Sequence, residues 1–234
     1  MSQNSIDADL FGRILYEDNH LLVVNKRPGE IVQGDQTGDE PLLEKVRTYI
    51  KISAAKPGNV FCGLVHRIDR PVSGAVAFAK TSKALARMNA IVKDRNIEKV
   101  YWALVEHAPA KESGTLVHYL LKNERNNKAI VSVNAKEGWQ RAELSYQTLA
   151  VGEHYTLIEV LLHTGRHHQI RAQLSAIGCP IKGDLKYGAR RSNDDGSISL
   201  HARSLRFIHP IKKVELCIEA PPFDTLFDNI ASSR

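Results

Sequence analysis

Residues 100–163 read VYWALVEHAPAKESGTLVHYLLKNERNNKAIVSVNAKEGWQRAELSYQTLAVGEHYTLIEVLLH and contain five runs with the composition of β-strands. The five runs are 100–106, 115–120, 129–133, 142–149 and 155–163. The connections between them have the length of hairpin loops, whereas a parallel crossover needs about a dozen residues or more. The block therefore predicts strands that pair antiparallel.

Shorter apolar runs outside this block predict further strands at 20–27, 75–79, 204–208 and 214–219. Apolar residues at helical spacing predict three helices, at 42–50, at 82–92 behind Thr81 or Ser82 as cap, and at 166–177. Thr164 is the expected cap of the third helix, and Gly178 its stop signal. Strands in groups with a few interspersed helices favour an α+β fold built on a largely antiparallel sheet. We expect a loose tail at 1–10 and a single catalytic domain at 11–234.

Composition limits the class of protein. With 234 residues, 43% of them hydrophobic and 25% charged, the chain is neither disordered nor fibrous. The net charge of +6 leans towards a polyanionic partner. Cys62, Cys179 and Cys217 are widely spaced, which argues against a disulfide framework or a thiolate zinc site and favours the cytoplasm. The first ten residues lack the pattern of a signal peptide, and no apolar run approaches the ~18 residues of a membrane helix.

The first segment that could carry chemistry is HRIDRPVSG, residues 66–74. Such a loop can direct the Asp69 carboxylate into a cleft, while Arg67 and Arg70 keep it ionised and attract phosphate. Two alternatives are a salt-bridged surface turn and a metal pair formed by His66 and Asp69, although nothing nearby completes a ligand set.

Two further segments stand out. Tyr101 lies early in a predicted strand, where its ring could stack on a nucleobase or simply pack in the core. The stretch TGRHHQIR, residues 164–171, is expected to begin a helix, whose first N–H groups favour phosphate. Arg171 lies one turn beyond His167 or His168 and could reach the same cleft. A basic helix end with solvated side chains is the alternative, and consecutive helical histidines point about 100° apart, which disfavours a shared metal.

HRIDRPVSG, then KVYWALV, then TGRHHQIRAQLSAIGCPIKGDLKYG occur in an order and spacing that closely resemble the RluA-type family of RNA pseudouridine synthases. The resemblance runs from near Ile14 to the closing segment that ends at Pro222. It implies a mixed, mainly antiparallel sheet split by a central basic catalytic cleft, with no metal or organic cofactor. Val72 and the stretch Arg27-Pro28-Gly29 depart from the family pattern. The N-terminal S4 RNA-binding domain of many relatives is expected to be absent.

The resemblance implies that specific uridines of ribosomal or transfer RNA are isomerised to pseudouridine. Asp69 matches the catalytic aspartate of the family, acting as nucleophile or base on a flipped-out nucleotide, Tyr101 its active-site tyrosine, and Arg171 the arginine expected to pair with Asp69. Residues expected to bind RNA are Arg67, Arg70, Arg166, His168, Lys182 and Lys186. The family also implies a monomer, and we expect no association with membranes.

Three other functions stay open on sequence alone. The first is a non-catalytic RNA-binding protein of the same fold. The second is a metal-dependent hydrolase that uses His66, His163, His167 and His168. The third is a glycoside hydrolase that pairs Asp69 with a second carboxylate such as Glu98 or Glu159, although no sequence feature supplies the defined carboxylate pair that those enzymes need.

Overall fold

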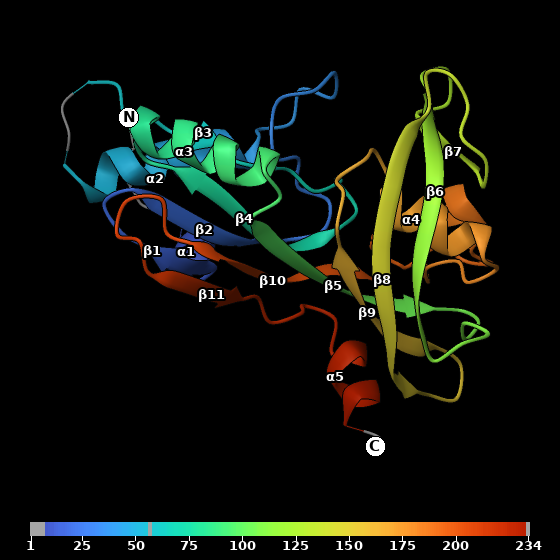
Figure 1. Cartoon of the computed structure of the whole chain (residues 1–234). Coiled ribbons are helices and arrows are strands. Elements are labelled where there is room, and N and C mark those ends of the chain that lie inside the picture. The colour runs from blue at the N-terminus through green and yellow to red at the C-terminus, as the bar shows by residue number, and fades with distance from the viewer. Residues whose placement is uncertain (1–7, 56–57, 233–234) are drawn as a thin grey trace. The chain divides into compact units, whose positions relative to one another are not determined.

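The computed structural model describes residues 8–55 and 58–232 (Figure 1). Its contacts divide the chain into two compact units. The first unit contains residues 1–97 and 204–221, and the second contains residues 98–203 and 222–234. Each unit is built on strands with helices packed against them, and each is described by itself.

Strands of the first unit pair in the order β1-β2-β4-β10, with β3 on β4 and β11 on β10. Their bounds are β1 Ile14–Glu17, β2 Leu21–Lys26, β3 Gly63–Leu64, β4 Ser73–Ala79, β10 Leu200–Ile208 and β11 Glu215–Glu219, and of β10 only residues 204–208 belong to this unit. β2 and β4 run antiparallel in a register that pairs Lys26 with Gly74. Every residue of both strands is buried, as expected of central strands covered on both faces. This pairing places the loop before β4 next to the end of β2.

Three helices belong to the first unit: α1 Ala8–Phe11, α2 Leu42–Ser53 and α3 Ser82–Lys93. Helix α3 begins where the sequence predicts, because the Thr81 side chain accepts a hydrogen bond from the Ala84 N–H. The buried side of α3, with Ala84 and Met88, packs on the alternate residues of β2 and β4 that face it. Packing against this core holds the two central strands in place.

The second unit carries the block of strands from which the fold is predicted. Their order is β5-β9-β8-β6-β7, and each neighbouring pair in this order is antiparallel. The bounds are β5 Ile97–Val105, β6 Ser113–Asn123, β7 Lys128–Ser132, β8 Gln140–Val151 and β9 Thr156–Leu162. All five predicted strands are present within a few residues. The expected α+β fold with a mixed, mainly antiparallel sheet is confirmed.

Helices of the second unit are α4 Gln169–Ala176, the short 3-10 helix η1 Leu185–Tyr187 and α5 Leu226–Ala231. One buried cluster joins Ala172 of α4 and Tyr187 of η1 to the hairpin of β6 and β7. A second cluster packs Phe227 and Ile230 of α5 against Leu104 and Leu157. The hairpin, α4 and η1 therefore form one packed group.

Two local predictions are wrong. Helix α4 begins at Gln169 rather than at Arg166, because His168 has a φ of 50° in the left-handed region, which an α-helix cannot contain. Thr164 is not its cap, since the Thr164 hydroxyl hydrogen-bonds the Gln169 side chain and accepts from the Glu143 N–H. Gly178, with a φ of 77°, follows the helix end as predicted.

The expected N-terminal tail also differs from the structure. Residues 8–10 belong to helix α1, and Leu10 is buried. Residues 1–7 of that tail lie outside the described part of the chain. No helix in the described part is both long enough and apolar enough to cross a membrane.

Candidate active site

The loop that carries Asp69 is held at both ends by hydrogen bonds with main-chain groups of the first unit. Before Asp69, the Ala77 N–H donates to Nε2 of His66 at 3.3 Å. After it, the Arg70 carbonyl accepts from the Gly29 N–H at 2.8 Å, and the Asp69 carbonyl accepts from the Val72 N–H at 3.1 Å. Asp69 itself is half-buried. The loop is thus a fixed platform for a carboxylate rather than a loosely paired surface turn.

Lys26 supports this loop through a hydrogen bond to its main chain. It is fully buried at the end of β2, and its ammonium donates to three main-chain carbonyls, of Arg27 at 2.8 Å, Glu30 at 2.8 Å and Arg70 at 3.1 Å. Burial lowers the pKa of Lys26 to about 7, and the negative charges of Glu30 and Asp69 offset part of this shift. Lys26 is not among the residues predicted for the site, although a lysine in the apolar run LLVVNK is a signal in the sequence that could have identified it.

The two arginines beside Asp69 differ in their surroundings. Arg67 is exposed, and none of the described residues pairs with it. Arg70 forms an exposed ion pair with Asp39 at 2.6 Å. An exposed pair of this kind contributes little stability, on the order of 0–1 kcal/mol, so a phosphate can compete for the guanidinium. Both geometries permit the predicted RNA contacts.

Tyr101 and Arg171 belong to the second unit. Tyr101 is buried on β5 and pairs in register with Val160 of β9. Arg171 is buried on α4 and forms a two-point ion pair with the buried carboxylate of Asp184. Nε donates to Oδ2 at 2.7 Å, and Nη2 donates to Oδ1 at 2.9 Å. This fork-to-fork geometry fixes the plane of the guanidinium as well as its position.

The Tyr187 ring gives Arg171 a second support. The guanidinium carbon lies 5.1 Å from the ring centroid, within the range of a cation–π contact. The Tyr187 hydroxyl accepts from the Ala129 N–H at 2.7 Å and lies 3.0 Å from Nδ1 of His168. No local spacing rule in the sequence connects Asp184 or Tyr187 with Arg171, so neither contact is predicted from the sequence.

The other residues of TGRHHQIR have mainly local contacts. His168 is buried, its ring stacks on that of His167, and burial together with the Arg171 charge lowers its pKa well below the usual range. The contacts that the structure shows for His168 are therefore the stacking on His167 and the hydrogen bond with the Tyr187 hydroxyl, and its RNA contact stays a prediction. Arg166 donates through Nε to the Arg141 carbonyl at 3.1 Å. The expectation that the histidines point apart on a helix is wrong, because both precede α4.

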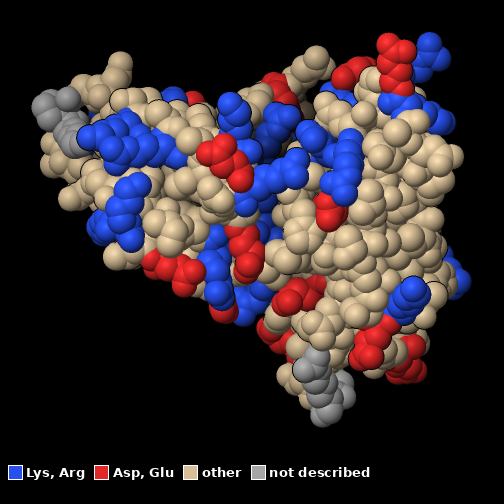
Figure 2. Space-filling view, viewed as in Figure 1, with Lys and Arg blue, Asp and Glu red and all other residues tan. Residues whose placement is uncertain are grey.

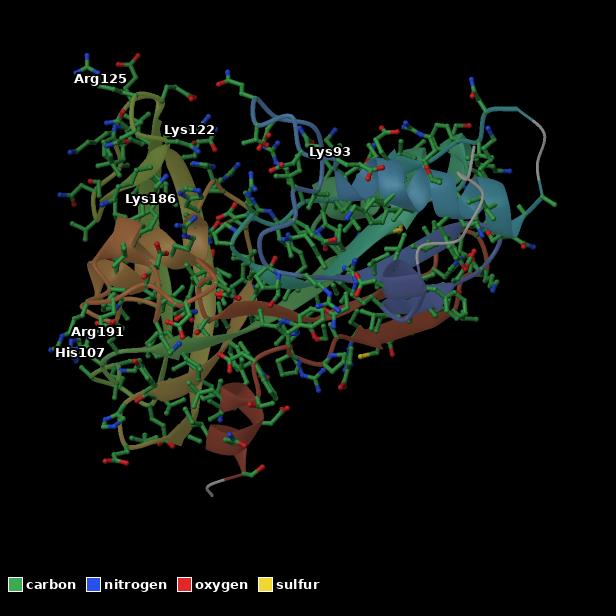
Figure 3. All side chains as sticks on the ribbon, turned by 180° about the vertical axis from the view of Figure 1, so that it is seen from behind. Lys93, His107, Lys122, Arg125, Lys186 and Arg191 are labelled. Atoms are coloured by element: carbon green, nitrogen blue, oxygen red, sulfur yellow. The ribbon has the colours of Figure 1, made fainter. Side chains whose placement is uncertain are left out.

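The predicted lysines also differ in their contacts. The Lys182 ammonium donates to the Asn193 side chain at 2.6 Å and is half-buried, so it orders a loop. Lys186 is exposed and reaches the Asn127 carbonyl at 3.2 Å. Figure 3 shows Lys186 on the same side as Lys122 and Arg125 of the β6–β7 hairpin, and Figure 2 shows both cations and carboxylates at the tip of this hairpin. Lys122 pairs with Glu124 there at 2.6 Å. Lys186 is thus an exposed cation, whereas the Lys182 ammonium contacts Asn193.

A metal site finds no support in the described residues. Across 8–55 and 58–232, no three His, Cys, Asp or Glu side chains lie close enough together to hold a metal ion. His163, one proposed ligand, hydrogen-bonds the Ser145 hydroxyl at 2.8 Å. Glu159, one candidate partner for Asp69 in a glycoside hydrolase, accepts from the Trp102 indole at 3.2 Å. These contacts account for the two side chains without metal or sugar chemistry.

Comparison of the sequence with known proteins identifies the family that this chain matches. The model of the family described as RNA pseudouridylate synthase matches residues 20–176, a span that contains Asp69, Tyr101 and Arg171. Ribosomal large subunit pseudouridine synthase C of Vibrio cholerae is 35% identical over 220 residues, covering 92% of this chain and 67% of the relative. Ribosomal large subunit pseudouridine synthase D of Zymomonas mobilis is 34% identical over 225 residues, covering 89% and 69%.

Solved structures support the fold. Human RNA Pseudouridylate Synthase Domain Containing 4 superposes with a TM-score of 0.78 at 24% identity, covering 96% of this chain and 93% of that one. Human RNA Pseudouridylate Synthase Domain Containing 1 superposes with a TM-score of 0.72 at the same identity. At 24% identity, these similarities show the fold alone.

Proposed function

Because the chain belongs to the RluA-type family of RNA pseudouridylate synthases, whose members isomerise uridine in RNA to pseudouridine, we propose that it modifies large-subunit ribosomal RNA, with Asp69 as its catalytic carboxylate. The names of the two relatives, both ribosomal large subunit pseudouridine synthases, support the substrate. The observation that carries the role of Asp69 is the fixed loop, pinned by Lys26, Gly29 and Ala77. A carboxylate that attacks a sugar carbon needs this kind of preorganisation.

The chemistry needs only the side chains of this chain and the RNA. The target uridine first leaves the base stack, which costs about a few kcal/mol. The Asp69 carboxylate then attacks C1′ or removes a ribose proton, and the C1′–N1 bond breaks. The freed uracil turns and its C5 bonds to C1′; this step breaks the Asp69–C1′ bond in the first route, and in the second route Asp69 returns the proton to the ribose. The C5 proton leaves to solvent while N1 gains one, so atoms and charge balance without a cofactor.

Arg171 and Tyr101 have supporting roles in this proposal. Arg171, held by Asp184 and Tyr187, pairs with Asp69 and keeps it ionised. Tyr101 stacks on the exposed uracil and assists removal of the C5 proton. Arg67, Arg70, Arg166 and Lys186 bind phosphates of the flanking RNA. The two compact units function in this scheme as a single, monomeric catalytic domain in the cytoplasm.

Pseudouridine formation on separate RNA pools tests the substrate. Unmodified large-subunit ribosomal RNA and unmodified transfer RNA, both made by transcription, are incubated with the protein and digested to nucleosides. We expect pseudouridine in the ribosomal RNA and none in the transfer RNA. Pseudouridine in transfer RNA alone would overturn the substrate while leaving the chemistry intact.

A further inference from the structure

Lys99 differs from the other inward-facing lysines in its contacts. It lies near the start of β5, is half-buried, and no acceptor in the described part of the chain lies within hydrogen-bonding distance of its ammonium. In contrast, Lys26 contacts three carbonyls, Lys182 contacts Asn193, and Lys80 contacts Glu17 at 2.5 Å. Lys99 is thus a partly desolvated cation without a counterpart.

Such a cation is unfavourable in the free protein. Burial alone lowers the pKa of Lys99, and no neighbouring charge offsets the shift. A desolvated charge is normally paired or hydrogen-bonded, because leaving it unpaired destabilises the fold. An anion arriving with the substrate would supply the missing partner.

Two features place the Lys99 ammonium beside the segments that the proposed function uses. Residues two apart on a strand point to the same face, so Lys99 and Tyr101 lie on one side of β5, about 6.8 Å apart along the strand. The ammonium also lies 3.4 Å from the position that a Cβ on Gly165 would occupy. Lys99 is therefore next to the turn that leads to α4, on the same face as the tyrosine proposed to stack on uracil.

We propose that Lys99 is a phosphate-binding residue, and that its ligand is a backbone phosphate of the RNA strand beside the target uridine. The inference rests on the proposed function for the identity of the RNA. A lysine ammonium suits this ligand because it is a compact charge with three donors, and phosphate is the anion that every nucleotide presents. The span between Lys99 and Tyr101 allows one nucleotide to contact both.

Two substitutions and one control test this assignment. Lys99→Met removes the charge and keeps an unbranched side chain, whereas Lys99→Arg keeps the charge. Lys93→Met is the matched control, because Lys93 at the end of α3 is exposed and has no partner among the described residues (Figure 3). For each protein, the dissociation constant for transcribed large-subunit ribosomal RNA is measured across a potassium chloride series, together with kcat, KM and urea unfolding.

Lys99→Met should weaken RNA binding and raise KM roughly tenfold, with kcat at saturating RNA within about twofold of wild type. The slope of log affinity against log salt should fall by about one unit, since one phosphate contact is lost. The free protein should be as stable as wild type or more stable, because an unpaired charge has been removed. Lys99→Arg should restore most of the affinity, and Lys93→Met should match wild type.

An unchanged affinity and salt slope for Lys99→Met would overturn the assignment. A loss of stability in Lys99→Met would also overturn it, because that result indicates a structural lysine. If wild type binds RNA through Lys99 and makes no pseudouridine, the proposed function fails while the phosphate contact stands. If wild type does not bind RNA at any salt concentration, both fail.

Discussion

Arg171 and Asp184 form a buried ion pair that joins α4 to the residue before η1, with N–O distances of 2.7 and 2.9 Å. Nε and Nη2 both donate to the Asp184 carboxylate, so the orientation of the guanidinium is set within the second unit. Asp184 is therefore a positioning residue for the arginine that we propose to act beside Asp69.

Replacing Asp184 by Asn should lower both stability and activity. The substitution removes the charge of the buried carboxylate that pairs with Arg171, and breaking a buried ion pair typically costs about 3–5 kcal/mol. Urea unfolding measures the loss, and Asp194→Asn in an exposed loop is the control, expected to change stability by less than about 0.5 kcal/mol. Equal stability of Asp184→Asn and wild type would show that the pair does not support the fold.

Tyr187→Phe removes the hydroxyl and keeps the ring, so it tests the contribution of the hydroxyl alone. The ring still faces Arg171 and Lys128, whose ammonium lies 5.0 Å from the centroid, but the buried Ala129 N–H loses its acceptor. We expect a stability loss of about 1–3 kcal/mol. Hydrogen exchange at the Ala129 amide should accelerate more than at the neighbouring amides of β7. Unchanged protection of that amide would contradict the contact.

The buried ammonium of Lys26 predicts a pH dependence of stability. Its pKa is about 7 in the folded chain, against 10.5 for an ordinary lysine. Between these pH values the unfolded chain binds more protons at this residue, so its contribution to stability rises with pH. This contribution to stability is fully present above pH 10.5, the pKa of the lysine in the unfolded chain, and it is lost as the pH falls through about 7.

Unfolding of wild type and of Lys26→Met in urea from pH 6.5 to 9.5 tests this expectation. The difference in unfolding free energy should move in favour of wild type as the pH rises. A difference that is flat across this range would indicate that Lys26 keeps its proton throughout.

Local signals account for the predictions that the structure confirms. The five strands of residues 100–163 are found because their apolar runs and short connections are local properties of the chain, and antiparallel pairing follows from them. The cap at Thr81 is likewise a local hydrogen bond, closed within three residues.

Features decided by distant contacts escape this kind of prediction. Threonine is a common helix cap, but the Thr164 hydroxyl instead accepts a hydrogen bond from the N–H of Glu143, which is distant in sequence. Arg171 is expected to pair with Asp69, and the buried partner that the structure adds is Asp184, brought there by the turn after α4. Lys26 is a similar case, since its acceptor Arg70 lies 44 residues away. Whether Asp69 is catalytic stays a prediction that chemistry must decide.

Release of tritium from RNA labelled at C5 of its uracils tests that central claim most directly, because isomerisation must expel the C5 hydrogen. Wild type and Asp69→Asn are compared on the same labelled ribosomal RNA, with filter binding as a control for RNA affinity. We predict release by wild type, none by Asp69→Asn, and nearly equal binding by both. Release by Asp69→Asn at the wild-type rate would contradict the catalytic role of Asp69, and absence of release by wild type despite tight binding would indicate an RNA-binding protein instead.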